Sequence, residues 1–141
     1  MTNEQIVAAC RKHYTAFSND CSGFVRAVTA ELGHPVSGNA NGIMNELANS
    51  TSTWQPITRE AAVEAVKAGA LVIAGLKSHD HNPPRNNGHV VIVVDGALYR
   101  NTYPLVWGGS IGSAQSPGTK SVGEVWSRAD RDSVLYYKLK Q

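Results

Sequence analysis

The residues best suited to chemistry lie in segment 19–25, where a cysteine stands at the predicted start of an amphipathic helix. Asn19 or Asp20 can cap this helix, and its apolar face begins at Phe24. Cys21 would then lie in the first helical turn, where free backbone N–H groups and the helix dipole favour negative charge. We expect this position to lower the pKa of the thiol, and the thiolate is the attacking species in amide hydrolysis.

A thiolate nucleophile needs a partner that takes up its proton and later gives one to the leaving amine, and histidine does both near neutral pH. Among the five histidines, His89 stands out because Gly88 precedes it and an apolar, strand-like run, 89–94, follows it. A glycine at that point allows the close approach of a helix end or a substrate. A cysteine at a helix start followed by a histidine at a strand start is the order found in papain-like amidases. The sequence predicts Cys21 as nucleophile and His89 as base.

The other reactive side chains have simpler interpretations. Cys10 lies on the apolar face of a predicted helix, which is typical of a small buried hydrophobic residue. The run 79–81, His-Asp-His, could bind a metal, and a metal-dependent hydrolase using it with His89 is one alternative. Its place in a loop rich in proline and asparagine favours a solvated turn. Trp107, between Pro104 and two glycines, could line a cleft.

Helices are predicted first and strands second, which indicates the α+β class. The helical segments begin at a cap on Asn3, at the Asn19–Asp20 pair, at Asn41 and at a cap on Thr58, and a short helix is predicted over 122–126. The strands are predicted over 71–76, 89–94, 97–100 and 134–139, with a hairpin turn at Asp95-Gly96. Segments 49–56, 78–87 and 108–118 are predicted as loops.

Length and charge narrow the class of protein. A chain of 141 residues is the usual size of one domain, so we expect a single catalytic domain over 1–141. The net charge is +2, and the basic residues form no patch in the sequence, so nucleic-acid binding is not supported. No apolar run reaches the ~18 residues of a membrane span, and the first residues lack the pattern of a signal peptide.

Segments 19–25 and 88–90 resemble the NlpC/P60 and CHAP group of cell-wall amidases. A closer resemblance, to the first family of type VI secretion amidase effectors, runs over nearly the whole chain. It is carried by the following stretches: Gly38 to Asn41, Leu71 to Lys77, Leu98 to Arg100, Tyr103-Pro104, Gly109 to Ile111, Lys120 to Gly123, Val125-Trp126 and Asp130 to Asp132. The resemblance implies a compact papain-like, NlpC/P60-like fold with N-terminal helices packed on an antiparallel sheet.

The same resemblance implies an antibacterial toxin, made in the cytoplasm and delivered by the type VI apparatus to the periplasm of a rival cell. There it would act as a DL-endopeptidase on the bond between γ-D-glutamate and meso-diaminopimelate in peptidoglycan stems. A cognate immunity protein would protect the producer, and neither a metal nor an organic cofactor is implied. The family's nucleophile and catalytic histidine fall on Cys21 and His89. Substrate contacts are expected from the residues near this pair: Asp20, Ser22, Asn41, Trp107 and Ser110.

Two departures from the family are expected to matter. Loop 78–87 is longer than usual and directly precedes His89, so it can alter access to the cleft. Segment 106–108 lacks the cysteines of the best-known branch, so Gly108 could orient the imidazole only through its backbone carbonyl. Side-chain alternatives for this role are Asp95, Asn101 and Ser110.

Two other functions fit the same residues. A housekeeping or phage-type cell-wall hydrolase would share the chemistry and need no immunity partner. A noncatalytic wall-binding module would bind sacculi without cutting them, and its Cys21 thiol would be inert.

Overall fold

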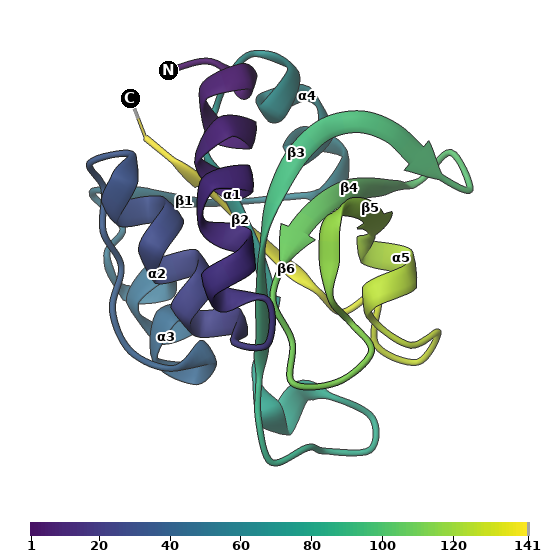
Figure 1. Cartoon of the computed structure of the whole chain (residues 1–141). Coiled ribbons are helices and arrows are strands. Elements are labelled where there is room, and N and C mark those ends of the chain that lie inside the picture. The colour runs from purple at the N-terminus through teal and green to yellow at the C-terminus, as the bar shows by residue number, and fades with distance from the viewer. Residues whose placement is uncertain (141) are drawn as a thin grey trace.

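The computed structural model describes residues 1–140 and confirms an α+β protein whose N-terminal helices pack on an antiparallel sheet (Figure 1). The helices are α1 (Asn3–Phe17), α2 (Cys21–Glu31), α3 (Ala40–Asn49), α4 (Arg59–Lys67) and α5 (Val122–Val125), and a 3-10 turn, η1 (Ser78–Asp80), follows the second strand. The strands are β1 (Trp54–Ile57), β2 (Val72–Leu76), β3 (His89–Tyr99), β4 (Tyr103–Gly108), β5 (Ser116–Ser121) and β6 (Leu135–Leu139). No helix within residues 1–140 is long and apolar enough to cross a membrane.

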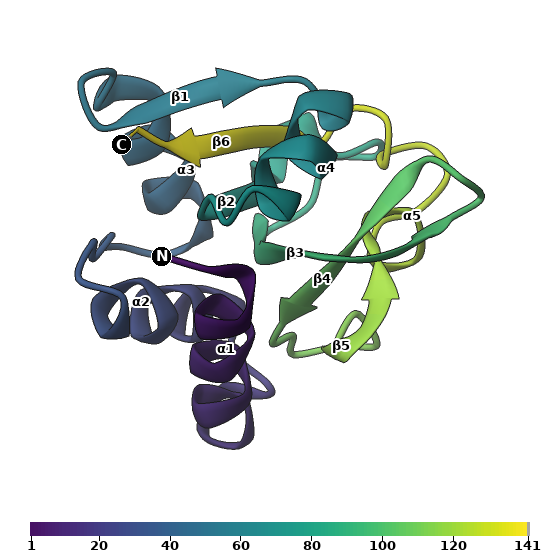
Figure 2. The same cartoon turned by 90° about the horizontal axis from the view of Figure 1, so that it is seen from above.

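The six strands form one sheet in the order β1-β6-β2-β3-β4-β5, and every neighbouring pair is antiparallel (Figure 2). The long central strand β3 pairs with β2 on one side and with β4 on the other. The first residue of β3, His89, pairs with Leu76, the last residue of β2. His89 therefore lies at the rim of the sheet, where the predicted strand start placed it.

The sheet is covered on both faces, so alternate residues of β3 enter two different hydrophobic clusters. Val90 and Ile92 pack with residues of α1, α2 and α3, whereas Val91 and Val93 pack with residues of α4. Burial on both faces explains why 89–94 reads as a continuous apolar run rather than an alternating one. The rim that carries His89 is thus the end of a strand that is packed on both faces.

Side-chain caps set the starts of the helices. Asp20 caps α2, because its Oδ1 accepts a hydrogen bond of 2.9 Å from the N–H of Gly23. Thr58 caps α4 as predicted. Helix α1 is capped by Thr2, with Gln5 completing a capping box, and not by Asn3. The cap at Asp20 is the one that matters for the site, because it makes Cys21 the first residue of α2.

The predicted hairpin turn at Asp95-Gly96 is wrong. β3 continues through both residues to Tyr99, with an irregularity in its pairing to β4 between Val94 and Tyr99. The chain reverses instead at Arg100 and Asn101, whose φ angles are 54° and 55°. These are the two positive φ angles that a tight hairpin turn requires, so backbone geometry fits there and not at the Asp-Gly pair.

Two edge strands lie partly in segments predicted as loops. β1 overlaps segment 49–56 and β5 overlaps segment 108–118. Both strands are short and largely exposed, and each contains a proline, Pro56 in β1 and Pro117 in β5. Proline is tolerated at a sheet edge, where one side of the strand needs no hydrogen-bond partner. The four-residue length of β1 and the polar composition of β5 conceal them from pattern-based prediction.

Candidate active site

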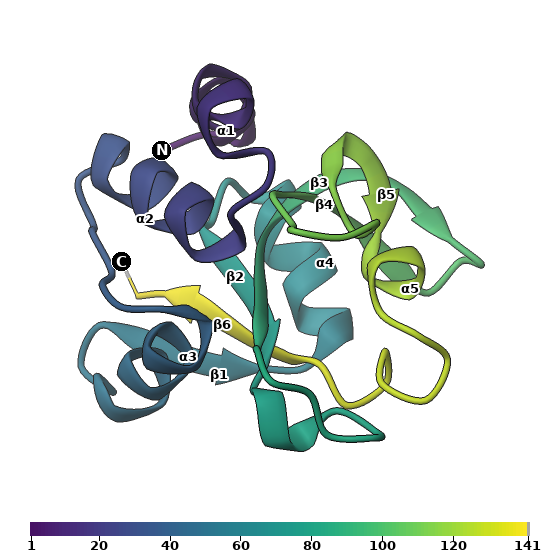
Figure 3. The same ribbon diagram turned by 60° about the horizontal axis from the view of Figure 1, so that its bottom comes forward.

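The predicted nucleophile and base line one cleft of about 690 Å³. Several segments that are distant in sequence build it: the start of α2, the start of α3, the loop before β3, the loop after β4, and α5 with the residues that follow it. Seen from below, these segments face the viewer (Figure 3). Of the expected substrate contacts, four line the cleft: Asp20, Ser22, Asn41 and Ser110.

The thiol of Cys21 sits among backbone N–H groups. The backbone N–H groups of Val90, Ser22 and Cys21 itself lie near the sulfur and lower the pKa of the thiol, which favours the thiolate. Val90 directly follows His89, so this contact joins the first turn of α2 to the start of β3. The helix end therefore brings the sulfur to the strand end that carries the imidazole.

The pKa of the Cys21 thiol is nevertheless raised, contrary to the lowered pKa expected from its helical position. Burial is the largest cause, because it removes water from the thiolate, and the negative charge of Asp20 adds to it. The N–H groups at the helix start oppose both effects without overcoming them. The site thus favours a protonated thiol, which would have to transfer its proton in order to act as a nucleophile.

The imidazole of His89 is equally biased toward its neutral form. Burial lowers its pKa to about 4, and the charges of His81 and Arg85 contribute in the same direction. Its ring stands edge-on to Trp126, with centroids 5.1 Å apart. Nε2 is buried and has no hydrogen-bond partner among the described residues. The ring nitrogen available to a thiol in the cleft is therefore Nδ1.

Helix α3 holds the base of the loop that carries His89. The side chain of Asn41 forms two hydrogen bonds of 2.9 Å to Ser78, donating to its Oγ and accepting from its N–H. A Cβ on Gly88 would come within 2.6 Å of Asn41 Oδ1 and 3.0 Å of the Leu76 carbonyl. Gly88 thus permits the close approach of a helix end, as predicted. Asn41 therefore ties the loop to α3 and lines the cleft, and its NH₂ group keeps a second hydrogen that Ser78 does not use.

The loop after β4 is packed tightly against the turn between α1 and α2. A Cβ on Gly109 would lie 2.0 Å from the Phe17 carbonyl oxygen, so only glycine fits. The N–H of Ser110 donates to the Ser18 carbonyl at 3.0 Å, and its Oγ accepts from the N–H of Gly112. Ile111, 84% exposed, stands at the mouth of the cleft.

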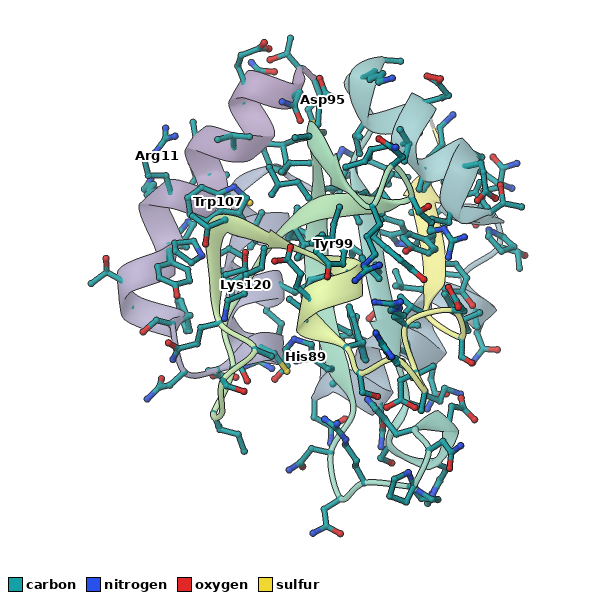
Figure 4. All side chains as sticks on the ribbon, turned by 90° about the vertical axis from the view of Figure 1, so that its right-hand side faces the viewer. Arg11, His89, Asp95, Tyr99, Trp107 and Lys120 are labelled. Atoms are coloured by element: carbon teal, nitrogen blue, oxygen red, sulfur yellow. The ribbon has the colours of Figure 1, made fainter. Side chains whose placement is uncertain are left out.

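Trp107 lies outside this cleft. It is buried beside α1, edge-on to Tyr14 and under the guanidinium of Arg11, and Figure 4 shows it well away from His89. Gly108 was expected to orient the imidazole through its carbonyl, but it lies over Val91, and its carbonyl accepts no hydrogen bond from Nε2 of His89. The aromatic residue that does face the imidazole is Trp126.

His81 is the cleft residue that sequence reasoning missed. The run 79–81 was expected to be a solvated turn, and His79 and Asp80 are indeed exposed, but His81 is only 2% exposed and lines the cleft. Its Nδ1 lies 2.9 Å from the Lys77 carbonyl oxygen. The short turn η1 directs this third residue inward, and nothing in the local composition signals it. Within residues 1–140, no three His, Cys, Asp or Glu side chains gather in a group able to hold a metal.

The arrangement has the parts needed for acyl transfer. A thiol, an uncharged imidazole and several N–H groups meet in one cleft that is partly shielded from water. A neutral imidazole can take the thiol proton as the sulfur attacks, and N–H groups at the sulfur can stabilise a developing oxyanion.

Comparison with known proteins shows the family to which the chain belongs. No family model matches the chain. The peptidoglycan amidase Tse1 of Pseudomonas aeruginosa PAO1 is 45% identical to it over 143 residues, which cover 94% of this chain and 87% of that protein. Similarity at this level over nearly the whole of both chains extends far beyond the cysteine and histidine motifs. The chain belongs to the family of type VI secretion amidase effectors that includes Tse1.

Proposed function

We propose that this protein is a peptidoglycan amidase that uses Cys21 as its nucleophile and His89 as its general base and acid. The observation that carries the proposal is that Cys21, the first residue of α2, and His89, the first residue of β3, line the same cleft. Similarity to an amidase of peptidoglycan supplies the substrate class.

The reaction begins with a neutral pair. As Sγ of Cys21 bonds to the carbonyl carbon, its proton passes to Nδ1 of His89. The N–H of Cys21 stabilises the oxyanion. The C–N bond then breaks, His89 gives its proton to the departing amine, and a thioester remains. A water molecule that His89 deprotonates hydrolyses this thioester and restores the thiol.

Within peptidoglycan, the bond we assign is the one between γ-D-glutamate and meso-diaminopimelate in the stem peptide. The acyl group held on Cys21 would be the glutamyl side. Ser22 and Ser110 line the cleft beside the pair and can contact the stem, while Asp20 and Asn41 shape the cleft through their hydrogen bonds to Gly23 and Ser78. No cofactor enters these steps.

The biological role we propose is that of an antibacterial effector. Delivery by the type VI apparatus to the periplasm of a target cell would give the enzyme access to its substrate, and a cognate immunity protein would occupy the cleft in the producer. Expression directed to the periplasm should lyse cells and should be relieved by that partner. A housekeeping or phage-type hydrolase would need no such partner.

The test is mass spectrometry of muropeptides from a Gram-negative wall after incubation with the wild-type protein, Cys21→Ala and the matched variant Cys10→Ala. Fragments ending in D-glutamate should appear with the wild type and Cys10→Ala and be absent with Cys21→Ala. Stems left intact by all three proteins would overturn the amidase proposal in favour of a wall-binding module. Cleavage at a different amide would correct the assigned bond alone.

A further inference from the structure

Three ring nitrogens around the cleft are buried and lack hydrogen-bond partners: Nε2 of His81, Nε2 of His89 and Nε1 of Trp126. Leaving a buried polar atom unsatisfied costs about 1–3 kcal/mol, and most such atoms in proteins are paired. Because three such nitrogens belong to residues that line one cleft, we expect them to share hydrogen bonds in the active protein.

The tautomer of His81 is fixed by its neighbour. Nδ1 lies 2.9 Å from the Lys77 carbonyl oxygen, and because a carbonyl can only accept, Nδ1 carries the hydrogen. Neutral His81 therefore presents Nε2 as an acceptor. The next residue is anchored as well, since the N–H of Asn82 donates at 2.6 Å to buried Asp130. The hydrogen bond to Lys77 before it and the anchor at Asn82 after it therefore fix the position of the His81 ring.

The other two nitrogens are donors. When Nδ1 of His89 is free to take the thiol proton, its Nε2 carries the hydrogen, and the indole nitrogen of Trp126 always does. Among these three atoms, His81 Nε2 is the one that can accept. The topology places the two histidines at the same end of the sheet: Leu76 pairs with His89, and Lys77 and the turn η1 lead from Leu76 to His81. The effect of the His81 charge on the pKa of His89 agrees with this proximity.

We propose that His81 is a positioning residue for His89. One water molecule accepts the Nε2–H of His89 and donates to Nε2 of His81, because neither nitrogen has a direct partner within residues 1–140, and this bridge holds Nδ1 of His89 toward the Cys21 thiol. His81 would thereby fill the role first expected of the Gly108 carbonyl, from the loop that precedes β3 rather than from β4. The inference rests on the proposed function, in which His89 is the base. It gives the long loop 78–87 a part in the chemistry.

Two variants of His81 separate its two hydrogen bonds. Asparagine can reproduce the Nδ1 donor to the Lys77 carbonyl but places no atom at the Nε2 position. Glutamine reaches the Nε2 position with a carbonyl that can accept. We expect His81→Asn to lower kcat about tenfold to a hundredfold, the effect typical of losing a residue that orients a histidine. KM should stay within about twofold, since substrate contacts remain, and His81→Gln should recover much of the loss.

A measurement that needs no substrate tests the contact itself. Long-range ¹H–¹⁵N NMR of the wild-type histidine rings should show His89 protonated on Nε2 and His81 on Nδ1, and His81→Asn should turn His89 into a mixture of tautomers. Protonation of wild-type His89 on Nδ1, or a His89 tautomer and kcat unchanged in His81→Asn, would overturn the inference. The expected tautomers in a protein that leaves muropeptides intact would support the inference about His81 and contradict the proposed function.

Discussion

The two cysteines lie on consecutive helices and have opposite surroundings. Cys10, in the middle of α1, is completely buried among apolar residues, and burial alone raises the pKa of its thiol. Cys21, at the first residue of α2, is half-buried, lines the cleft and is contacted by three N–H groups. The contrast shows that reactivity is set by access and by polar neighbours rather than by the thiol, and that a helix start alone does not make a thiolate.

The largest difference between the two cysteines should be in turnover. Cys21→Ala removes the nucleophile and should lower kcat about a thousandfold or more, as loss of a catalytic nucleophile does. Cys10→Ala should leave kcat unchanged, because Cys10 faces the core. Both are measured as cleavage of stem peptides at matched concentrations of folded protein. Activity retained in Cys21→Ala would remove the proposed role of this residue.

The pH dependence of kcat/KM should reveal the neutral pair. His89 must be uncharged to accept the thiol proton, and its pKa is lowered to about 4 by burial, with His81 and Arg85 adding to the effect. The imidazole is therefore neutral at every pH above about 4. Activity should fall as the pH drops through that value, by about tenfold per unit below it, and not near 6.5 where free histidine titrates.

This profile also distinguishes a preformed ion pair. A thiolate paired with an imidazolium would need His89 charged at neutral pH, which requires a raised pKa. The rate of Cys21 alkylation would then be level across neutral pH. We expect it instead to keep rising with pH, because the pKa of this thiol is raised.

Replacing each cysteine by serine should have opposite effects on stability. Cys10→Ser places a hydroxyl in an apolar core and should lower the free energy of unfolding by about 1–3 kcal/mol. Cys21→Ser should change it by less than about 1 kcal/mol, since the position borders the cleft and N–H groups are present. Urea unfolding measures both. An equal loss of unfolding free energy in the two variants would contradict the claim that Cys10 is in an apolar core and Cys21 borders a polar cleft.

The smallest effect concerns Asp20, which caps α2 and whose charge raises the pKa of Cys21. Asp20→Asn can keep the cap through its side-chain oxygen while removing the charge, so alkylation of Cys21 at neutral pH should become a few-fold faster. Asp20→Ala removes both and should lower the free energy of unfolding by about 1 kcal/mol. Alkylation that is slower in Asp20→Asn than in the wild type would reverse the assigned sign.

Much of this site could be predicted because its residues carry local signals. Asp20 and Cys21 mark a helix start, and Gly88 and His89 mark a strand start, so the pattern alone places the pair on two rigid elements. The α+β class followed from the same local patterns. These are short-range features, and sequence reports them directly.

The features that were predicted wrongly or missed depend on packing between segments distant in sequence. The chain reverses at Arg100 and Asn101, although Asp95-Gly96 is the stronger turn signal in the sequence, because β3 extends beyond Gly96 and pairs with β4 at Tyr99. Trp107 was expected to line the cleft, but Trp126 does so instead, because the tertiary fold decides which aromatic side chain reaches the imidazole. The raised pKa of Cys21 likewise comes from the burial that the assembled cleft imposes, which no local pattern records.

The most direct test of the central claim is to alkylate the wild-type protein with iodoacetamide, follow the loss of amidase activity, and map the modified residue by mass spectrometry of peptides. Activity should fall in proportion to modification of Cys21, while Cys10 stays unmodified in the folded protein. Full activity after complete modification of Cys21, or inactivation that follows modification of Cys10, would contradict that claim.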